Sequence, residues 1–425
     1  MRSRSSVNIA GRIRRRRQRH TDVFRIKSGA LGPVSQCELE IRPLTVFIGR
    51  QGTGKSLVAQ VLYFFEELPY LLAFAEGSQR QARQWDAQHI ARWILDQLRS
   101  HQRAFAVFAN PNVSIEWERS IPYGVSVQGR NLSKLALRAH KKTRSIAFPQ
   151  STRDIIDMLR DTVRRRKSST PDRRALFLPT ERMVISQLRT ALSEKILSLP
   201  LTYTLFADWL ESASAIASEW PTGQPDSKVA QRIGQIGQEA LGGRAERWGE
   251  QWKWRFSAGK QGSQFDIDMA SSGQRANWSL PYIAQTLFDL RESGEIAQSV
   301  TLFVEEPEIH LHPSAQVEMV KILALLVREG FRVVLTTHSL NVIYALNNFM
   351  QASRLGDVVD EGVPEPEVRL KPQDVSVYAF TQGAPRQLVD TEAAFIDERE
   401  LGWVSEDLAA SLNRIGALTL QEEEP

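Results

Sequence analysis

The chain has 425 residues, of which 42% are apolar and 24% charged, and its formal net charge is +5. This length is enough for about two or three lobes around a large core, and no apolar run approaches the length of a membrane span or follows the basic N-terminus as a secretory signal would. The single cysteine, Cys37, excludes an internal disulfide and a cysteine-based zinc site, and it predicts a reducing, cytoplasmic location.

Positive charge is concentrated at the N-terminus. Residues 1–27 contain nine arginines and one lysine against a single acid, Asp22, so this segment carries +9 while the remainder carries −4. We expect residues 1–22 to form a disordered basic arm. A second basic cluster lies within residues 130–167. Both segments are candidate contacts for nucleic acid, and both are also explained as solvated surface.

A glycine-rich turn with the pattern G-x-x-x-x-G-K-S begins at residue 49. The apolar stretch 44–48 before it predicts a buried strand, and the stretch 57–65 after it predicts a buried helix. In this setting the glycines let backbone N–H groups point at a phosphate, Lys55 supplies a cation, and the Ser56 hydroxyl can bind Mg²⁺. The predicted nucleotide-binding residues here are Gly49, Arg50, Gln51, Gly52, Thr53, Gly54, Lys55, Ser56 and Leu57.

The middle of the chain has a different pattern, because amphipathic helical stretches alternate with polar breaks over residues 67–264. We expect an inserted, mainly helical lobe there, with a small hairpin at 113–117 and 125–128. The segments 248–256 and 265–269 predict strands that return to the core. The expected divisions are a basic arm at 1–22, the two parts of an α/β ATPase core at 23–66 and 265–385, the lobe at 67–264 between them, and a C-terminal extension at 386–425.

Two later strands deliver polar side chains to one predicted site. The apolar run 300–304 ends in Glu305 and Glu306, and the run 332–335 leads into a T-T-H-S segment that contains His338. The carboxyl ends of parallel strands meet at the same edge of a sheet, where α/β proteins place their chemistry. Glu305 is placed to reach Mg²⁺, Glu306 to polarise an attacking water, and His338 to contact a γ-phosphate or hold that water.

A second candidate anion site precedes a predicted helix near residue 272. It would use unpaired N–H groups and the positive end of the helix dipole. Its residues are Ser271, Ser272, Gly273 and Gln274.

The order of these motifs resembles ABC-type ATPases, in the soluble branch that includes SMC proteins, RecF-type repair ATPases and the OLD (overcoming lysogenization defect) family. The segment E-E-P-E-I-H-L-H-P at 305–313 and the segment F-L-P-T-E-R at 177–182 are especially similar to OLD-related bacterial AAA family ATPases. The resemblance covers about 23–66 and 265–385, and the helical middle matches loosely.

The resemblance implies an α/β P-loop NTPase core with a large inserted helical lobe, which uses ATP and Mg²⁺. It implies that Lys55 and Ser56 act in the phosphate loop, Glu305 at the metal, Glu306 as the catalytic glutamate and His338 as the switch histidine. The segment that includes Ser272 and Gly273 would cap ATP bound to a partner subunit. The implied mechanism is ATP-driven head-to-tail dimerisation.

Some features depart from the family pattern. Relatives usually carry Pro-Asn where this chain has Arg50 and Gln51. The glutamine that normally links Mg²⁺ to the lobe has no obvious counterpart, with Gln150 as a guess. His310 and His312 suggest a metal site, but residues two apart on a tight turn rarely converge on one ion, and the resemblance places this turn at the dimer interface.

The biological role divides into several classes. The resemblance favours an ATPase sensor or motor of a bacterial anti-phage defence or toxin–antitoxin-like system, acting with a separate effector protein. About forty-five residues follow Phe380, too few for a Toprim nuclease domain. The alternative is a RecF-like repair ATPase that binds DNA. The Arg83 and His89 spacing also matches HEPN ribonucleases, although this pattern is short. A membrane transporter ATPase is disfavoured by the size of the lobe.

Overall fold

The computed structural model describes residues 22–78, 113–118, 124–128, 134–138, 173–183, 201–220, 223–249, 251–257, 264–293, 296–381, 383–397, 407 and 409–415. Within these ranges, none of the helices combines the length and the apolar character needed to cross a membrane.

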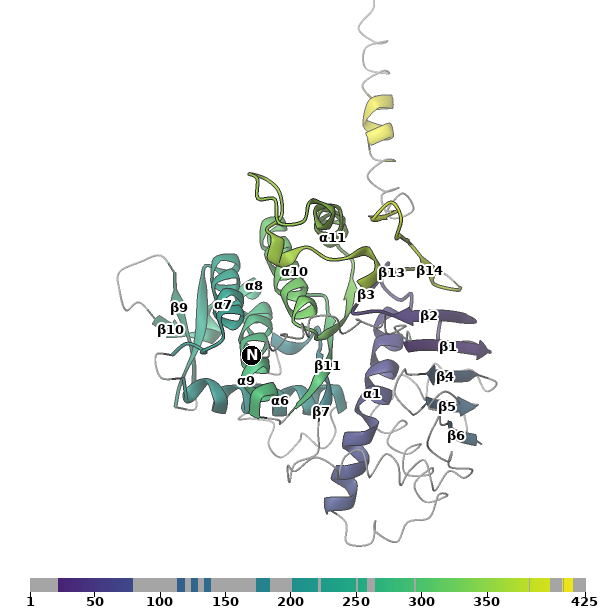
Figure 1. Ribbon diagram of the computed structural model, residues 1–425, viewed down its shortest axis with the longest axis horizontal. Coiled ribbons are helices and arrows are strands. Elements are labelled where there is room, and N and C mark those ends of the chain that lie inside the picture. Colours follow the sequence, from purple (N-terminus) through teal and green to yellow (C-terminus); the bar gives the residue numbers. More distant parts are fainter. Residues whose placement is uncertain are drawn as a thin grey trace, which may run out of the picture.

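A six-stranded sheet forms the centre of the molecule (Figure 1). Its strands pair in parallel except for the last, which runs antiparallel at one edge. Because the five parallel strands share one direction, their carboxyl ends meet at a single edge of the sheet. In spatial order the strands are β7 (Arg173–Leu178), β11 (Ile296–Glu305), β12 (Arg332–Thr337), β3 (Leu44–Gly49), β13 (Val375–Phe380) and β14 (Arg386–Gln387).

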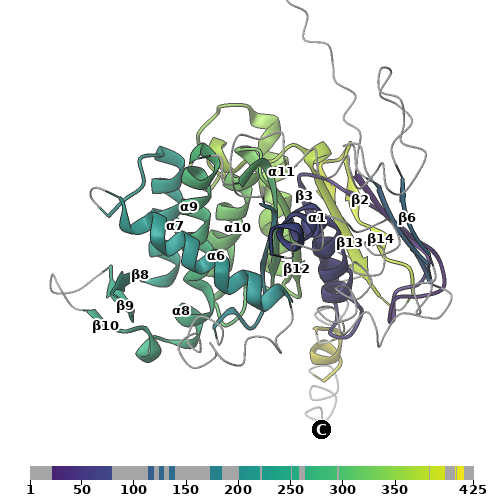
Figure 2. The same cartoon turned by 90° about the horizontal axis from the view of Figure 1, so that it is seen from below.

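A second sheet is antiparallel and lies on the other side of helix α1 (Lys55–Ser78), as Figure 2 shows. Buried side chains of α1, such as Tyr63 and Phe64, share one core cluster with both sheets. The helix that follows the glycine-rich turn is therefore covered on both sides. The strands of this sheet, in order, are β2 (Cys37–Ile41), β1 (Asp22–Ser28), β4 (Ser114–Glu118), β5 (Gly124–Gln128) and β6 (Lys134–Arg138).

Helices cover the opposite face of the central sheet. Side chains alternate between the two faces along each strand, so Val46 and Ile48 pack against these helices while Phe47 packs toward α1. A strand buried on both faces explains why residues 44–48 are apolar except for Thr45. The helices are α6 (Leu201–Ser218), α7 (Lys228–Leu241), α9 (Ser279–Ser293), α10 (Pro313–Arg328) and α11 (Leu340–Ala352).

A small three-stranded sheet stands beside α7, formed by β8 (Gly243–Trp248), β9 (Gln251–Phe256) and β10 (Gln264–Asp266). Helix α8 (Ser272–Asn277) follows it. The remaining short elements are η3 (Ile267–Met269), η4 (Ser353–Leu355), η5 (Pro366–Val368), η6 (Pro372–Asp374), β15 (Val389–Asp390) and β16 (Phe395–Ile396).

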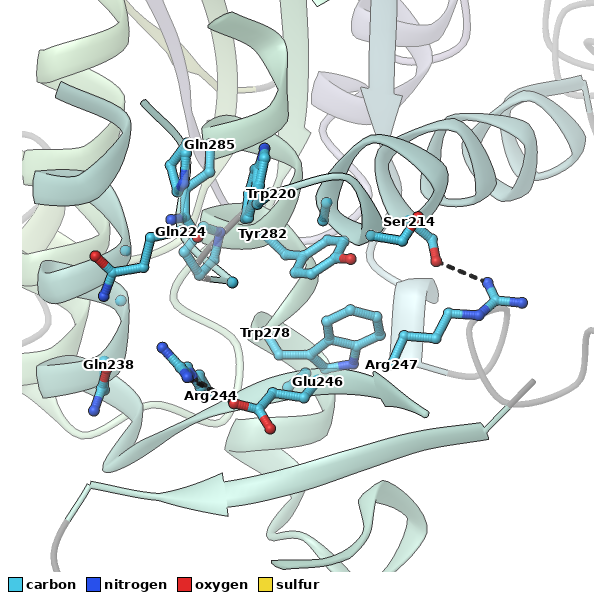
Figure 3. A pocket seen from close by; sticks show the side chains of 18 of the residues that line it. Ser214, Trp220, Gln224, Gln238, Arg244, Glu246, Arg247, Trp278, Tyr282 and Gln285 are labelled. Atoms are coloured by element: carbon cyan, nitrogen blue, oxygen red, sulfur yellow. Dashed lines mark hydrogen bonds and ion pairs between the residues drawn. The ribbon is translucent and has the colours of Figure 1, made fainter. Parts of the chain in front are cut away.

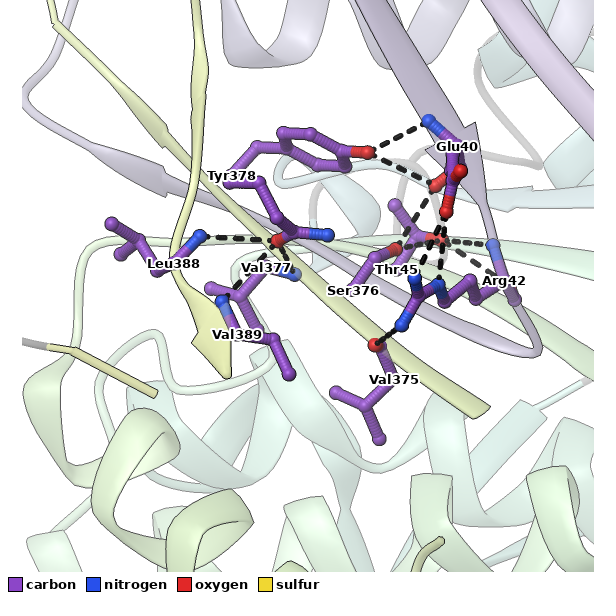
Figure 4. A network of polar contacts seen from close by, with 10 residues as sticks. Glu40, Arg42, Thr45, Val375, Ser376, Val377, Tyr378, Leu388 and Val389 are labelled. Carbon is purple, nitrogen blue, oxygen red and sulfur yellow. Dashed lines mark hydrogen bonds and ion pairs between the residues drawn. The ribbon is translucent and has the colours of Figure 1, made fainter. Parts of the chain in front are cut away.

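Polar side chains lock β3 to the edge of the sheet near the start of the strand (Figure 4). The hydroxyl of Ser376 donates to Thr45 Oγ1 at 3.0 Å, and both residues are fully buried. Arg42 Nη1 donates to the carbonyl of Val375 at 3.1 Å, and the Tyr378 hydroxyl accepts from the backbone N–H of Glu40 at 2.7 Å. These paired polar groups join β13 to β3 through Thr45, and to β2 and the turn after it through Glu40 and Arg42.

The expected α/β core is confirmed. The predicted hairpin at 113–117 and 125–128 is present, because β4 and β5 pair antiparallel. The strands within 248–256 and 265–269 belong to the separate sheet of β8–β10, while Trp254 and Ile267 pack in the same core cluster as Val46. Strands β4 to β7 lie inside the range expected to be mainly helical, and they pair with strands of the two core sheets. The sequence did not predict these pairings with the core sheets. The reason is that strand pairing joins residues far apart in the sequence, which local periodicity does not detect.

The turn between β3 and α1 offers a stability test, because its glycines differ in their surroundings. Gly54 has a φ of 93°, and an added Cβ would lie 2.5 Å from Val34 Cγ2. Gly52 has a φ of 74°, and its Cβ would meet no atom within 4 Å. We expect Gly54→Ala to lower the free energy of unfolding by about 2–3 kcal/mol and Gly52→Ala by about 1 kcal/mol. Urea denaturation without nucleotide measures both, and equal losses would contradict the packing argument.

Candidate functional site

The carboxyl edge of the central sheet gathers most of the predicted site residues. Along this edge Thr336 lies opposite Phe47 and Glu305, and Val304 lies opposite Leu178. The segments that continue beyond these strand ends are therefore neighbours. They are the glycine-rich loop after β3, the Glu305–Glu306 pair, the T-T-H-S segment after β12, and the P-T-E-R segment after β7.

The loop at 49–56 binds the side chain of its own Lys55. Lys55 Nζ donates to the carbonyls of Gly49 and Arg50 at 2.8 Å each, and the residue is buried. Burial lowers the pKa of Lys55 to about 8, although the nearby carboxylates of Glu306, Glu308 and Glu305 oppose this shift. An ammonium that has lost most of its water is ready to bind an anion that replaces that water.

Gly49 is required by the sheet itself. Its φ is 149°, and a Cβ at this position would lie 2.2 Å from the carbonyl oxygen of Phe380 on β13. The side chains of Arg50 and Gln51, where this chain departs from the family pattern, are exposed.

Glu305 sits at the end of β11 with only 4% of its surface exposed. Burial raises the pKa of this carboxyl to about 7, against the opposing effect of the Ser56 hydroxyl and the Thr180 N–H, which lies 3.4 Å from Oε2. Oε1 makes no hydrogen bond to any residue that the structure describes. A desolvated carboxylate beside a hydroxyl suits a hard cation such as Mg²⁺, which prefers oxygen ligands.

The described ranges hold no group of three or more His, Cys, Asp or Glu side chains that could bind a metal. Mg²⁺ in nucleotide sites is typically held by one or two protein oxygens together with phosphate oxygens. Ser56 and Glu305 match that kind of site.

Glu306 and His338 form a pair across the ends of β11 and β12. His338 Nε2 lies 3.3 Å from Glu306 Oε1, and both side chains are partly exposed. This contact with His338 holds the pKa of Glu306 below its usual range in spite of partial burial, with Lys55 and Arg182 contributing. The carboxylate is thus ionised at neutral pH and able to accept a proton or a hydrogen bond.

Glu308 ties the two strand ends together. Its Oε1 accepts from the Thr337 hydroxyl at 2.6 Å and from the backbone N–H of His338 at 2.8 Å. The turn after Glu306 therefore fixes the backbone that carries His338.

Arg182 is a functional candidate that sequence reasoning missed. Its side chain is almost fully buried and makes five hydrogen bonds. It donates to the carbonyls of Glu305 at 2.7 Å and Glu306 at 3.0 Å, and also to the carbonyl of Ala276 and the side chain of Asn277 on or beside α8, at 2.6 and 2.9 Å. Burial lowers the pKa of Arg182 to about 10. The sequence did contain a signal for Arg182: a charged residue that follows an apolar strand closely, within the P-T-E-R segment.

The S-S-G-Q segment begins α8 with a capping box. The Ser271 hydroxyl accepts from Gln274 N, and Gln274 Oε1 accepts from Ser271 N at 3.0 Å. Gly273 packs so closely that a Cβ would lie 2.6 Å from the carbonyl oxygen of His310. Ser271 and Ser272 are exposed. Figures 1 and 2 both place α8 well to one side of α1.

The structure thus brings together the loop residues 49–56, Glu305, Glu306 and His338, while residues 271–274 occupy a separate surface. Arg182 connects the two regions through the far end of α8. Several sequence predictions fall outside the described residues: the basic arm, Arg83, His89, Gln150 and most of the 130–167 cluster.

Comparison with known proteins gives a family match. The protein-family model described as "AAA ATPase domain" matches residues 130–343, half of the chain. This range includes β7, the helices of the lobe, α8, Glu305, Glu306 and His338, and it excludes the glycine-rich loop. A search of curated proteins finds no match.

Among solved structures, three SMC head domains are similar at low identity. The SmcHead bound to the C-winged helix domain of ScpA has a TM-score of 0.43 and 12% identity, covering 88% of this chain and 98% of the other. The SMC head domain from Thermotoga maritima has a TM-score of 0.38 and 10% identity, covering 87% and 98%. An Smc head domain with an extended coiled coil, bound to the C-terminal domain of ScpA derived from Pyrococcus furiosus, has a TM-score of 0.38 and 11% identity, covering 91% and 98%.

Arg182 can be tested by a substitution that keeps its charge. Lysine cannot reproduce the planar fork that reaches five acceptors, so Arg182→Lys should leave buried carbonyls unpaired. We expect it to lower the free energy of unfolding by about 3–5 kcal/mol. The control Arg232→Lys changes a partly exposed arginine that pairs with Glu365 and Glu367, and should cost under about 1 kcal/mol. Chemical denaturation measures both, and an Arg182→Lys loss no larger than the control would contradict the proposed importance of the fork.

Proposed function

This chain belongs to the AAA ATPase domain family, and we propose that it binds and hydrolyses ATP at the carboxyl edge of the central sheet. The observation that carries the proposal is the convergence of the buried Lys55 ammonium, the Glu305 carboxylate and the Glu306–His338 pair at that edge. These groups come from three different strands, yet they supply a cation, a metal ligand and a base.

The loop would hold the β- and γ-phosphates. Positive φ values at Gly49, Gly52 and Gly54 let the intervening backbone curve in a way that side chains would obstruct. The loop leads directly into α1, so the unpaired N–H groups of the first helical turn face the bound anion. Lys55, which now donates to loop carbonyls, would extend its ammonium to the phosphates.

Ser56 and Glu305 would hold Mg²⁺. The ion would supply charge neutralisation for the phosphate oxygens. Glu306 is ionised and partly exposed beside this position, so it can accept a hydrogen bond from an attacking water and orient it. His338 steadies the Glu306 carboxylate, and Glu308 fixes the His338 backbone.

We infer that the complete site contains two copies of the chain. Ser271 and Ser272 are exposed at the start of α8, away from the glycine-rich loop of their own chain. Within the described residues, the Ser271 side chain caps the helix. A head-to-tail pair would place the Ser271–Gln274 segment of one copy on the nucleotide held by the other. ATP would then join the two copies, and hydrolysis would release them.

The biological process is a further proposal, supported by the resemblance of the E-E-P-E-I-H-L-H-P and F-L-P-T-E-R segments. We propose an ATPase subunit of a bacterial defence or toxin–antitoxin-like system that works with a separate effector. The alternative is a RecF-like repair ATPase that contacts DNA through 1–27 and 130–167. A nuclease or toxin that co-purifies with the protein would favour the first, and replication or repair proteins the second.

The catalytic assignment predicts a split between binding and turnover. Lys55→Ala should abolish ATP binding, because the loop loses its cation. Glu306→Gln should bind ATP normally but hydrolyse it about 10²–10⁴-fold more slowly, and it should accumulate as an ATP-bound dimer. Glu318→Gln, on the surface of α10, is the control and should keep the wild-type rate. Phosphate release and size-exclusion chromatography measure the two effects; wild-type hydrolysis by Glu306→Gln would refute the assignment.

The composite site predicts rescue between two inactive variants. Ser272→Glu should place a negative charge against the phosphates, while an acid in the first turn of α8 leaves the helix stable. Neither Lys55→Ala nor Ser272→Glu should hydrolyse ATP alone. Mixed at equal concentrations, they should recover about a quarter of the wild-type rate, because half of the dimers hold one intact site. A mixture that forms mixed dimers but stays inactive would contradict the head-to-tail arrangement.

A further inference from the structure

A cavity lies between the lobe helices and α9, apart from the carboxyl edge of the central sheet. It has a volume of about 690 Å³ and is walled by α6, α7, β8 and the start of α9 (Figure 3). Pockets that hold small molecules typically measure about 300–1,000 Å³. Nothing in the proposed ATP site uses this space.

Two glycines on α7 shape the base of this cavity. A Cβ at Gly237 would lie 2.5 Å from Pro281 Cβ on α9, and one at Gly234 would lie 2.4 Å from Gln285 Nε2. The glycines therefore allow α7 to approach α9 closely. The cavity opens beside this tight contact, between rigid and well-packed elements.

One wall of the cavity is aromatic. Trp278 and Tyr282 have ring centroids 5.7 Å apart, and Trp252 packs behind them at 4.4 Å from Trp278 and 5.1 Å from Tyr282. Burial raises the pKa of Tyr282 to about 12, with a hydrogen bond to Ser214 and the charge of Arg247 opposing the shift. The ring therefore stays neutral and fixed, which suits the stacking of a planar ligand.

The arginines beside the cavity are held by hydrogen bonds within the chain. Arg244 and Arg255 each donate to Glu246 at 2.8 Å. Arg247 donates to Ser214 Oγ at 3.0 Å and to the carbonyl of Gly249 at 2.9 Å. These bonds fix the guanidinium of Arg247 in place without cancelling its charge.

Side-chain amides supply the remaining polar groups. Gln224, Gln238 and Gln285 line the cavity (Figure 3), and their amides make no hydrogen bond to any part of the chain that the structure describes. Each amide offers two donors and one acceptor. A glutamine amide can pair in a bidentate way with the ring nitrogen and exocyclic amine of adenine.

We propose that this cavity binds a purine base or nucleoside, stacked on Tyr282 beside the buried Trp278 and recognised by the glutamine amides. The site also touches α8, because Trp278 caps that helix and Gln274 Nε2 donates to the carbonyl of Leu241, which lines the cavity. An effect of the ligand on ATP turnover would rest on the proposed function, whereas its binding does not.

Titration calorimetry on the full-length protein, without ATP or Mg²⁺, tests the proposal with adenosine, guanosine, cytidine and uridine. We expect saturable one-to-one binding of a purine nucleoside and affinity at least about tenfold lower for both pyrimidines. The absence of saturable purine binding, or equal affinity for all four nucleosides, would overturn the proposal.

Five variants locate the binding. Gln238→Ala should weaken it by about tenfold, and Tyr282→Ala should weaken it further, while Tyr282→Phe keeps the ring and should retain most of it. Gln36→Ala, on a distant surface, is the matched control and should change nothing. Lys55→Ala should still bind the nucleoside even though it fails to bind ATP. The proposal would be refuted if Lys55→Ala no longer bound the nucleoside, or if Gln238→Ala and Tyr282→Ala both kept the wild-type affinity, because the nucleoside would then bind elsewhere. Thermal unfolding confirms that each variant is folded.

Discussion

The candidate site depends on one buried guanidinium. Arg182 follows β7 and donates to the main-chain carbonyls of Glu305 and Glu306, so it fixes the point where β11 ends and its two carboxylates begin. The same group reaches Ala276 and Asn277, and it thereby joins α8 to that point. A buried arginine is expensive unless each donor finds an acceptor, and here the five bonds satisfy that condition.

The double coverage of the central sheet gives this arrangement its rigidity. On one face α1 lies between two sheets, and on the other the lobe helices share a continuous core with Val46, Leu302 and Leu335. The strands are thus held from both sides. Polar groups that sit at those ends keep their geometry because the apolar residues before them are fixed.

Much of the candidate site could be predicted from the sequence, because each of its motifs is a run of consecutive residues. The glycine-rich loop, the Glu305–Glu306 pair and the T-T-H-S segment each follow an apolar strand, and parallel strands place their ends together. Arg182 was missed because its acceptors, Glu305 and Ala276, are about a hundred residues away in the sequence. The hairpin of β4 and β5 was predicted from local pattern, but its sheet and that of β7 were not, because only pairing with β1 and β11 reveals them.

The backbone of Glu306 has one further consequence. Its φ is 43°, a left-handed conformation that costs a residue with a side chain roughly 1–2 kcal/mol. The bond from Arg182 to its carbonyl and the bond from its N–H to Thr336 hold it there. The backbone conformation that presents this carboxylate is therefore strained. The position of this carboxylate thus depends on Arg182, which is bonded at the same time to Ala276 and Asn277 of α8.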